Sequence, residues 1–136
     1  LGTETYWQGI RDYYALYRNG TASTADFQRV MEERSGQELG WFFEQWLNQG
    51  GLPTIEGTWS HAGGKLALDL RQTQERYRFR LPLELRLDFA DGTSARETVW
   101  LDGERSEVAL EQAEAPVGVT PDPETWLLAV VELKAR

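Results

Sequence analysis

The side chains of this chain that could do chemistry are few. His61 is its only histidine and stands beside Gly63-Gly64, and no partner for metal binding lies near it in sequence. The chain has no cysteine, which excludes disulfides and thiolate metal sites. Because a metal ion needs several converging ligands, we interpret His61 as a surface histidine, with a metal ligand as the alternative.

Acidic, tyrosine and arginine side chains in the first third offer three further possibilities. An acidic patch that binds an amine could be formed by Glu32, Glu33, Glu38 and Glu44. Acids on an exposed helix face are common, so a solvated face is the simpler interpretation. Tyr13 and Tyr14 could stabilise an oxyanion, but their helical spacing favours core positions. Arg11 and Arg18 could line a substrate channel, or they could form ion pairs at the surface.

Tryptophan is the fourth candidate group. Trp59, Trp100 and Trp126 could form a platform on which a sugar ring stacks, or they could be buried anchors of a β-sandwich. We favour buried anchors. No glycine-rich phosphate loop precedes a helix, and no Gly-x-Ser-x-Gly nucleophile motif occurs.

Length and charge narrow the classes of protein that the chain can belong to. Its 136 residues suit one domain, or one domain with a helical annex. The net charge of −8 argues against nucleic-acid binding, because phosphate groups need clustered Lys and Arg. No apolar run approaches the roughly 20 residues of a membrane helix, so we expect no membrane segment. The chain begins with Leu1, which we interpret as a processed or excised N-terminus, and its compartment stays unknown.

Three helices are expected before residue 50. Thr3 is the predicted N-cap of the first helix. Its apolar stripe consists of Tyr6, Ile10, Tyr13 and Tyr17. Asn19-Gly20 should end this helix, since both residues tolerate positive φ.

The second and third helices follow the same logic. Ser23 or Thr24 should cap the second, with Ser23 and Asp26 approximating a capping box. Its apolar face is formed by Phe27, Val30 and Met31, and Ser35-Gly36 ends it. The third helix carries the broad stripe of a core-facing helix, formed by Leu39, Phe42, Phe43, Trp46 and Leu47.

The hydrophobic period changes to two after Gly50-Gly51 and Pro53. The clearest strand runs from residue 77 to 89, and its apolar face consists of Tyr77, Phe79, Leu81, Leu83, Leu85, Leu87 and Phe89. Further strands are expected at 66–70, 98–101, 108–110 and 126–133, with a bend at 121–123. Asp91-Gly92 and Asp102-Gly103 are predicted turns, and Pro82 should mark an edge or a bulge.

This order of elements predicts an α+β chain, in which a short N-terminal helical bundle segment precedes an antiparallel β-sandwich. Short strands with no helix between them favour a sandwich. The joint near residues 50–53 is too short for a flexible tether. We therefore expect the helices to pack directly on the sheet.

Four motifs in the helical stretch occur in an order that resembles a known enzyme family. They are Trp7-Gln8-Gly9-Ile10-Arg11-Asp12-Tyr13-Tyr14, the capped start Thr21 to Phe27, the pair Ser35-Gly36 with the aromatic run Trp41 to Leu47, and the exit Gly51-Leu52-Pro53. The pattern resembles the C-terminal portion of zinc-dependent aminopeptidases of the alanyl (membrane) aminopeptidase type, which are gluzincin metallopeptidases. The resemblance implies that residues 1–50 are the last helices of a metallopeptidase catalytic domain and that residues 51–136 are an immunoglobulin-like β-sandwich.

The resemblance also implies where the chemistry lies. In that family two His and a Glu hold zinc, a further Glu takes the proton of the bound water, and a Tyr stabilises the oxyanion. All of these precede the matched region. We therefore predict no catalytic, cofactor-binding or metal-binding residue in this chain, and zinc only in the parent enzyme.

The implied function follows from these expectations. The parent would remove N-terminal residues from peptides, and its partners would be the rest of the catalytic domain and a peptide substrate. This portion alone would be inactive and would buttress that domain. The alternatives are a non-catalytic β-sandwich that binds carbohydrate or protein, and an accessory or dimerisation domain without a ligand.

Overall fold

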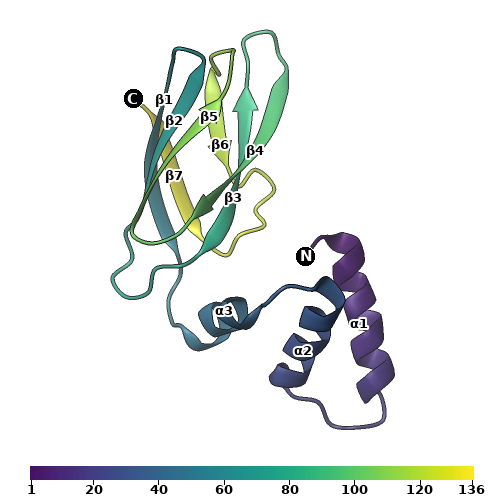
Figure 1. The fold of residues 1–136 in the computed structure, drawn as a ribbon. Coiled ribbons are helices and arrows are strands. Elements are labelled where there is room, and N and C mark those ends of the chain that lie inside the picture. The colour runs from purple at the N-terminus through teal and green to yellow at the C-terminus, as the bar shows by residue number, and fades with distance from the viewer. The chain divides into compact units, whose positions relative to one another are not determined.

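The computed structural model describes residues 1–136, which divide into two compact units, Leu1–Gln49 and Gly50–Arg136 (Figure 1). The first unit contains the helices α1 (Thr3–Tyr17), α2 (Thr24–Ser35) and α3 (Gly40–Phe43) and the π-helical turn η1 (Glu44–Asn48). The second contains the strands β1 (Thr54–Ala62), β2 (Lys65–Gln72), β3 (Leu81–Asp88), β4 (Ser94–Leu101), β5 (Arg105–Glu111), β6 (Gly118–Pro121) and β7 (Val130–Ala135). The chain is therefore mixed α+β, as predicted.

Helices α1 and α2 pack through a close approach at Gly9. Gly9 is the buried residue of α1, and a Cβ placed on it would lie 2.4 Å from the Met31 sulfur. The absence of a side chain at Gly9 thus leaves room for buried Met31 on α2. Arg34 of α2 also donates to the Asp12 carboxylate of α1, with Nε at 2.7 Å from Oδ2.

The helix ends follow the sequence signals in part. The capping box of α2 is confirmed, since Ser23 Oγ accepts from the Asp26 N–H and the Asp26 carboxylate accepts from the Ser23 N–H. Gly36 ends α2 with φ 66°, as its type predicts. The prediction for Thr3 was wrong, because Gly2 is the N-cap and Thr3 is already helical. Helix α1 ends close to the expected place, but without a residue of positive φ.

The predicted third helix with a single core-facing stripe was wrong. Helix α3 ends at Phe43, and the chain then widens into the π turn η1. A π turn bonds residue i to i+5, so the apolar residues that follow no longer share one face. Leu39 and Gln45 are buried, whereas Phe42 and Leu47 are exposed.

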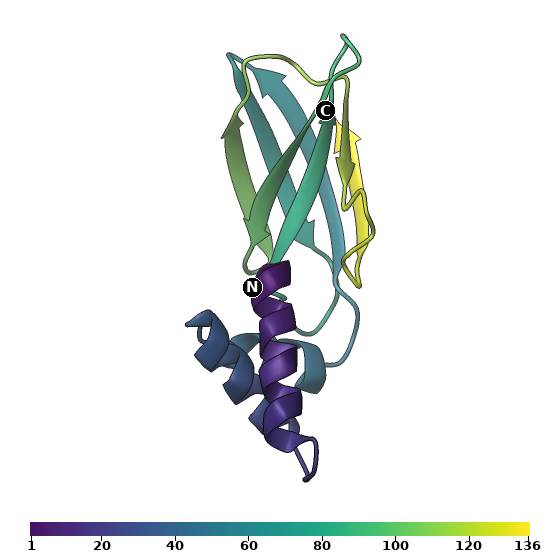
Figure 2. The same ribbon diagram turned by 90° about the vertical axis from the view of Figure 1, so that its right-hand side faces the viewer.

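The strands of the second unit form two facing sheets (Figures 1 and 2). One sheet has the order β5-β2-β1-β7, and the other has the order β4-β3-β6. All neighbouring pairs are antiparallel except β1 and β7, which run parallel. The second unit is therefore a sandwich-like arrangement of two antiparallel-rich sheets.

The period-two pattern correctly predicts which side chains fill the sandwich. The buried apolar residues of β2 and β3 are Leu66, Leu68, Leu70, Leu81, Leu83, Leu85 and Leu87. Phe79, Phe89, Val99 and Leu101 complete the same core together with Ile55 of β1. Their intervening neighbours point outward, as alternation along a strand requires.

Strand β3 begins at Leu81 rather than at Tyr77, and the side chain of Gln72 is the reason. Gln72 is buried at the end of β2, and its Oε1 accepts from the Phe79 N–H at 2.8 Å while its Nε2 donates to the Phe79 carbonyl at 2.6 Å. Both backbone groups of Phe79 are thus satisfied by a side chain instead of a neighbouring strand. Phe79 keeps its predicted buried position, but the expected strand over residues 77–80 is wrong.

Other predictions in this unit meet mixed outcomes. Gly92 and Gly103 adopt φ of 84° and 87° in turns, as expected. Pro82 lies where β3 is paired with β4 alone, because β6 pairs only with residues 85–88 of β3, so the predicted local edge is confirmed. The expected strand from Trp126 was wrong at its start, since β7 begins at Val130.

Candidate functional site

His61 is engaged with the backbone in the second unit. It lies on β1, and its Nε2 is 2.7 Å from the Gln112 carbonyl oxygen, so that nitrogen carries a proton and donates. No group of three His, Cys, Asp or Glu side chains in the chain is placed to hold a metal ion. A single histidine does not match the two-His ligand set of the resembled family, so the zinc chemistry of that family is not assigned to these residues.

The four glutamates of the predicted acidic patch each serve the local structure. Glu32 Oε1 accepts from the Leu39 N–H at 2.8 Å and from Gln28 Nε2 at 3.0 Å. The Leu39 hydrogen bond is the main cause that lowers the pKa of Glu32. Glu33 pairs with Arg29. The remaining two accept hydrogen bonds from nearby groups, Glu38 from the Gly40 N–H and Glu44 from Asn48 and Gln49.

The tyrosines and arginines of α1 differ in their surroundings. Tyr13 packs against Phe27 with ring centroids 5.1 Å apart, but it is only half-buried, so the core prediction for it holds in part. Tyr14 is 68% exposed, so the core prediction for it was wrong. Arg11 donates to Gln8 at 3.0 Å on the helix surface, whereas no ion pair involves Arg18.

The three tryptophans do not form one platform, and two of them are not buried. Trp59 is half-buried and lies on the inward-facing side of β1, in line with Ile55. Trp100 is 53% exposed on the outer face of the other sheet, with the Arg80 guanidinium 5.6 Å from its ring centroid. Trp126 is 82% exposed in the loop before β7. The prediction of buried anchors was therefore wrong for Trp100 and Trp126.

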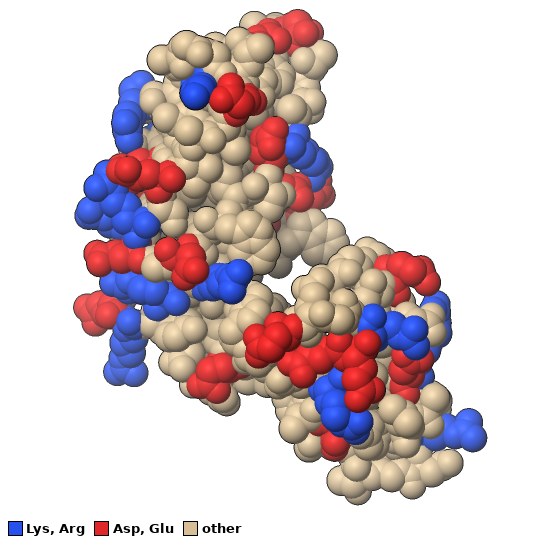
Figure 3. Space-filling model, viewed as in Figure 1, with Lys and Arg blue, Asp and Glu red and all other residues tan.

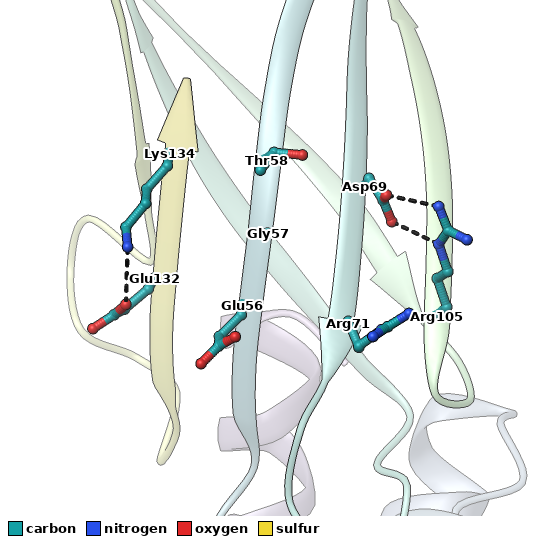
Figure 4. A pocket seen from close by; sticks show the side chains of 8 residues that line it. All are labelled: Glu56, Gly57, Thr58, Asp69, Arg71, Arg105, Glu132 and Lys134. Atoms are coloured by element: carbon teal, nitrogen blue, oxygen red, sulfur yellow. Dashed lines mark hydrogen bonds and ion pairs between the residues drawn. The ribbon is translucent and has the colours of Figure 1, made fainter. Parts of the chain in front are cut away.

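A concavity on the outer face of the β5-β2-β1-β7 sheet is the candidate site that the structure adds (Figure 4). It has a volume of about 380 Å³ and crosses all four strands. Its lining residues are Glu56, Gly57, Thr58, Asp69, Arg71, Arg105, Glu132 and Lys134. Basic (blue) and acidic (red) side chains are interspersed along the left-hand edge of the second unit in Figure 3.

One row of this face groups its charges by sign instead of alternating them. Strand register places Glu132 opposite Glu56, Glu56 opposite Arg71, and Arg71 opposite Arg105. The row therefore reads acid, acid, base, base across four strands. Like charges directly opposite each other destabilise a sheet, so the order is not one that optimises stability.

Asp69, which lies in the next row of the same face, forms the ion pairs at the edge of the concavity. Arg105 donates to both oxygens of Asp69 at 2.9 and 2.8 Å, and Arg136 lies 3.4 Å from the same carboxylate. The hydrogen bond from Arg105 is the main cause that lowers the pKa of Asp69, and it also raises the pKa of Arg105. Asp69 and Arg105 thus form a bidentate ion pair, so neither charge is free to bind a ligand.

Sequence reasoning missed this site because it depends on register. Glu56 and Arg71 are separated by a turn, and Glu132 lies in the last strand. The sequence contains the alternation that turns each of them outward, but it does not state which strands are neighbours.

Comparisons with known proteins add no relative. A scan against protein-family models finds no match for this chain, and no curated protein matches it significantly. None of its helices is both long and apolar enough to cross a membrane. The class that the fold defines is an α+β chain with a sandwich-like second unit.

Proposed function

We propose that this chain is the C-terminal portion of a zinc metalloaminopeptidase that removes N-terminal residues from peptides. The helical unit then forms the last helices of the catalytic domain, and the β unit braces that domain. This portion contributes no catalytic side chain of its own. The proposal rests on the order of motifs from Trp7 to Pro53.

The observation that supports it best is the apolar surface of the helical unit. Large apolar side chains exposed on this unit are Leu1, Tyr6, Trp7, Tyr14, Leu16, Phe42 and Leu47. Trp7 and Tyr14 lie on the same side of α1, because residues seven apart are about two helical turns apart. Exposed large apolar side chains that share one face, as Trp7 and Tyr14 do, are typical of surfaces that another part of a protein covers. The upstream catalytic domain is the cover that we propose.

The proposal extends to an immunoglobulin-like identity for the second unit. The order β5-β2-β1 corresponds to strands E, B and A of that fold, and the antiparallel pair β3-β6 corresponds to C and F. The departure is the last strand, which pairs in parallel with β1 instead of joining β6. These correspondences support the assignment. A related immunoglobulin-like domain should share the parallel pairing of its last strand with its first.

The first test is the reading frame upstream of Leu1. The proposal expects it to encode His-Glu-x-x-His, followed by a second zinc-binding Glu and then a Tyr. A frame without these residues would leave a binding or structural domain as the function.

A reconstitution experiment tests the buttressing role itself. The upstream catalytic portion, produced separately, should gain aminopeptidase activity when this chain is added. Trp7→Glu should reduce that gain by about tenfold, since a charge at the covered surface weakens docking by over 1 kcal/mol. Trp100→Glu is the matched control, because Trp100 is equally exposed but lies in the second unit. Equal loss in both variants would count against the helical surface as the docking face.

A binding module is the second candidate, and the exposure of Trp100 and Trp126 favours it. Exposed tryptophans with an apolar face and a polar edge are common at recognition surfaces. The chain would then be retained on a glycan array. Trp100→Ala or Trp126→Ala should abolish retention, while Trp59→Ala, which alters a half-buried ring, serves as a folding control.

A further inference from the structure

We propose that the outer face of the β5-β2-β1-β7 sheet binds short peptides with a free amino and a free carboxyl terminus. The ammonium group would lie between Glu132 and Glu56, and the carboxylate would lie against Arg71. This inference goes beyond the proposed function and does not depend on it, since every residue involved belongs to the second unit.

The order of charges in the central row has a cost. The row Glu132, Glu56, Arg71, Arg105 contains two directly opposed like-charge pairs. Exchanging the two central residues would convert the row to alternating signs and remove both repulsions. A row that forgoes this pairing instead offers a negative half and a positive half. Departures from local rules of this kind occur where a surface serves binding.

The charges in the row differ in how far they are already paired. Arg105 is occupied by Asp69 and by Glu107, at 2.8 and 2.7 Å. Glu132 forms one ion pair, with Lys134, at 4.0 Å. Glu56 and Arg71 form no ion pair, with each other or with any other residue, and Arg71 adds only the weakest of the charge effects that lower the pKa of Asp69. The two central charges are therefore available to bind a ligand.

Figure 4 shows why Glu56 and Arg71 do not neutralise each other. The Glu56 carboxylate turns toward β7 and Glu132, whereas the Arg71 side chain extends toward β5 and Arg105. The adjoining floor of the concavity is formed by the backbone of Gly57 and by the short Thr58, which lies in the next row opposite Asp69. The result is a trough with an acidic wall and a basic wall.

The spacing of the strands sets the size of the ligand. Neighbouring strands lie about 4.8 Å apart. The Arg71 side chain extends toward β5, so its guanidinium lies about two strand spacings, roughly 10 Å, from the ammonium position between Glu132 and Glu56. An extended chain spans about 3.4 Å per residue, so a tripeptide matches that separation. A simple anion would meet the two carboxylates, and a simple cation would meet the arginines. A ligand with both charges, one at each end, is the chemistry that the trough fits.

The experiment is an NMR titration of the intact chain with triglycine, observing the amides of β1, β2 and β7. A surface site with charge contacts in water should give saturable shifts with Kd on the order of 1 mM. Triglycine amide lacks the carboxylate, and N-acetyltriglycine lacks the ammonium group. Each should bind at least about tenfold more weakly. Free glycine separates an amino-acid site from a peptide site, because it cannot span the two walls.

Substitutions at Glu56 and Arg71 test whether the peptide binds at this row of charges. Glu56→Gln and Arg71→Gln should each weaken triglycine binding by about tenfold. The exchange variant, Glu56→Arg with Arg71→Glu, keeps the net charge and should abolish binding while raising the midpoint of thermal unfolding. Arg86→Gln, on the outer face of the other sheet, is the control that should leave binding unchanged.

Three results would overturn the inference. The first is the absence of saturable shifts on β1, β2 and β7 at concentrations about twentyfold above the expected Kd. The second is equal binding of triglycine and its two blocked forms. The third is unchanged binding by the exchange variant, whose raised unfolding midpoint would show that it is folded.

Discussion

The two units of this molecule hold themselves together by different means. The helical unit contributes Val30, Met31 and Leu39 to the buried apolar side chains, and all the others, from Ile55 to Leu101, belong to the β unit. Aromatic contacts such as Tyr13 with Phe27 and Phe27 with Phe43 link the helices, but these rings are only half-buried. The β unit therefore has a fully buried apolar core, whereas most of the apolar contacts of the helical unit remain partly exposed to solvent.

This difference in burial indicates which unit should be the more stable when it folds alone. Burial of apolar surface is the main favourable term in folding, at about 25 cal/mol per Å². The β unit gains that term from two facing sheets, while the helical unit leaves Trp7, Tyr14 and Leu47 in water. The helical unit should therefore be the less stable of the two, as expected for a segment that another domain covers.

The largest effect should come from Gln72, which holds the loop between β2 and β3. Gln72→Leu should cost about 3–4 kcal/mol, because it removes the hydrogen bonds that the buried Gln72 amide makes to the Phe79 N–H and carbonyl. Urea unfolding of the β unit measures the loss. Gln112→Leu is the control, since the Gln112 side chain forms no hydrogen bond. A cost below about 1 kcal/mol would mean that the loop is held by other contacts.

Gly57 should give the next largest effect. A Cβ at Gly57 would lie 2.6 Å from Leu70 Cδ2 and 2.9 Å from the Asp69 carbonyl oxygen. The backbone atom cannot move aside easily, so Gly57→Ala should destabilise the β unit by about 2–3 kcal/mol. Gly50→Ala meets no atom within 4 Å and should be nearly neutral. Equal midpoints for the two variants in urea would contradict the close approach of β1 and β2.

A smaller and local effect is expected in the helical unit. Met31→Ala should lower the stability of the α1–α2 pair by about 2 kcal/mol, because it empties the space over Gly9. Adding Gly9→Ala to that variant should recover part of the loss, since the new methyl group fills the same space. Circular dichroism of the helical signal during thermal unfolding follows both changes. Additive losses in the double variant would argue against this contact.

The smallest effect concerns pH and Glu32. Its pKa is lowered in the folded chain mainly by the Leu39 N–H, so folding is favoured by the ionised carboxylate. This contribution is fully present above the unfolded pKa of about 4.3 and is lost as pH falls through the folded pKa. Glu32→Gln should therefore flatten the acid side of the helical unit's unfolding midpoint. An unchanged acid limb would show that Glu32 does not hold the α2–α3 turn.

The fold was predictable where one strong local signal decides the outcome. The leucines of β2 and β3 alternate so regularly that the sandwich core could be named in advance, and Ser23 with Asp26 placed the start of α2. The failures have tertiary causes. Residues 77–80 have strand periodicity, but the Gln72 side chain satisfies their backbone at Phe79 instead. The predicted apolar stripe of the third helix is interrupted by the π turn η1, which the spacing of its apolar residues does not reveal.

The candidate site was not predictable at all, for a related reason. Alternation shows that Glu56, Arg71 and Glu132 face away from the core. Their meeting in one row requires the parallel pairing of β1 with β7, which joins the two ends of the β unit. Exposure of Trp126 was equally hidden, because its apolar type suggests burial and only the loop before β7 places it in solvent.

Hydrogen exchange of the intact chain, followed by NMR residue by residue, tests the contrast between the units most directly. Amides of β1, β2 and β3 should exchange only through global opening of the β unit, and those of α1 and α2 should exchange at least about a hundredfold faster. Equal protection in both units would contradict this contrast, because it would show that the helical unit is as complete as the sandwich and needs no covering domain.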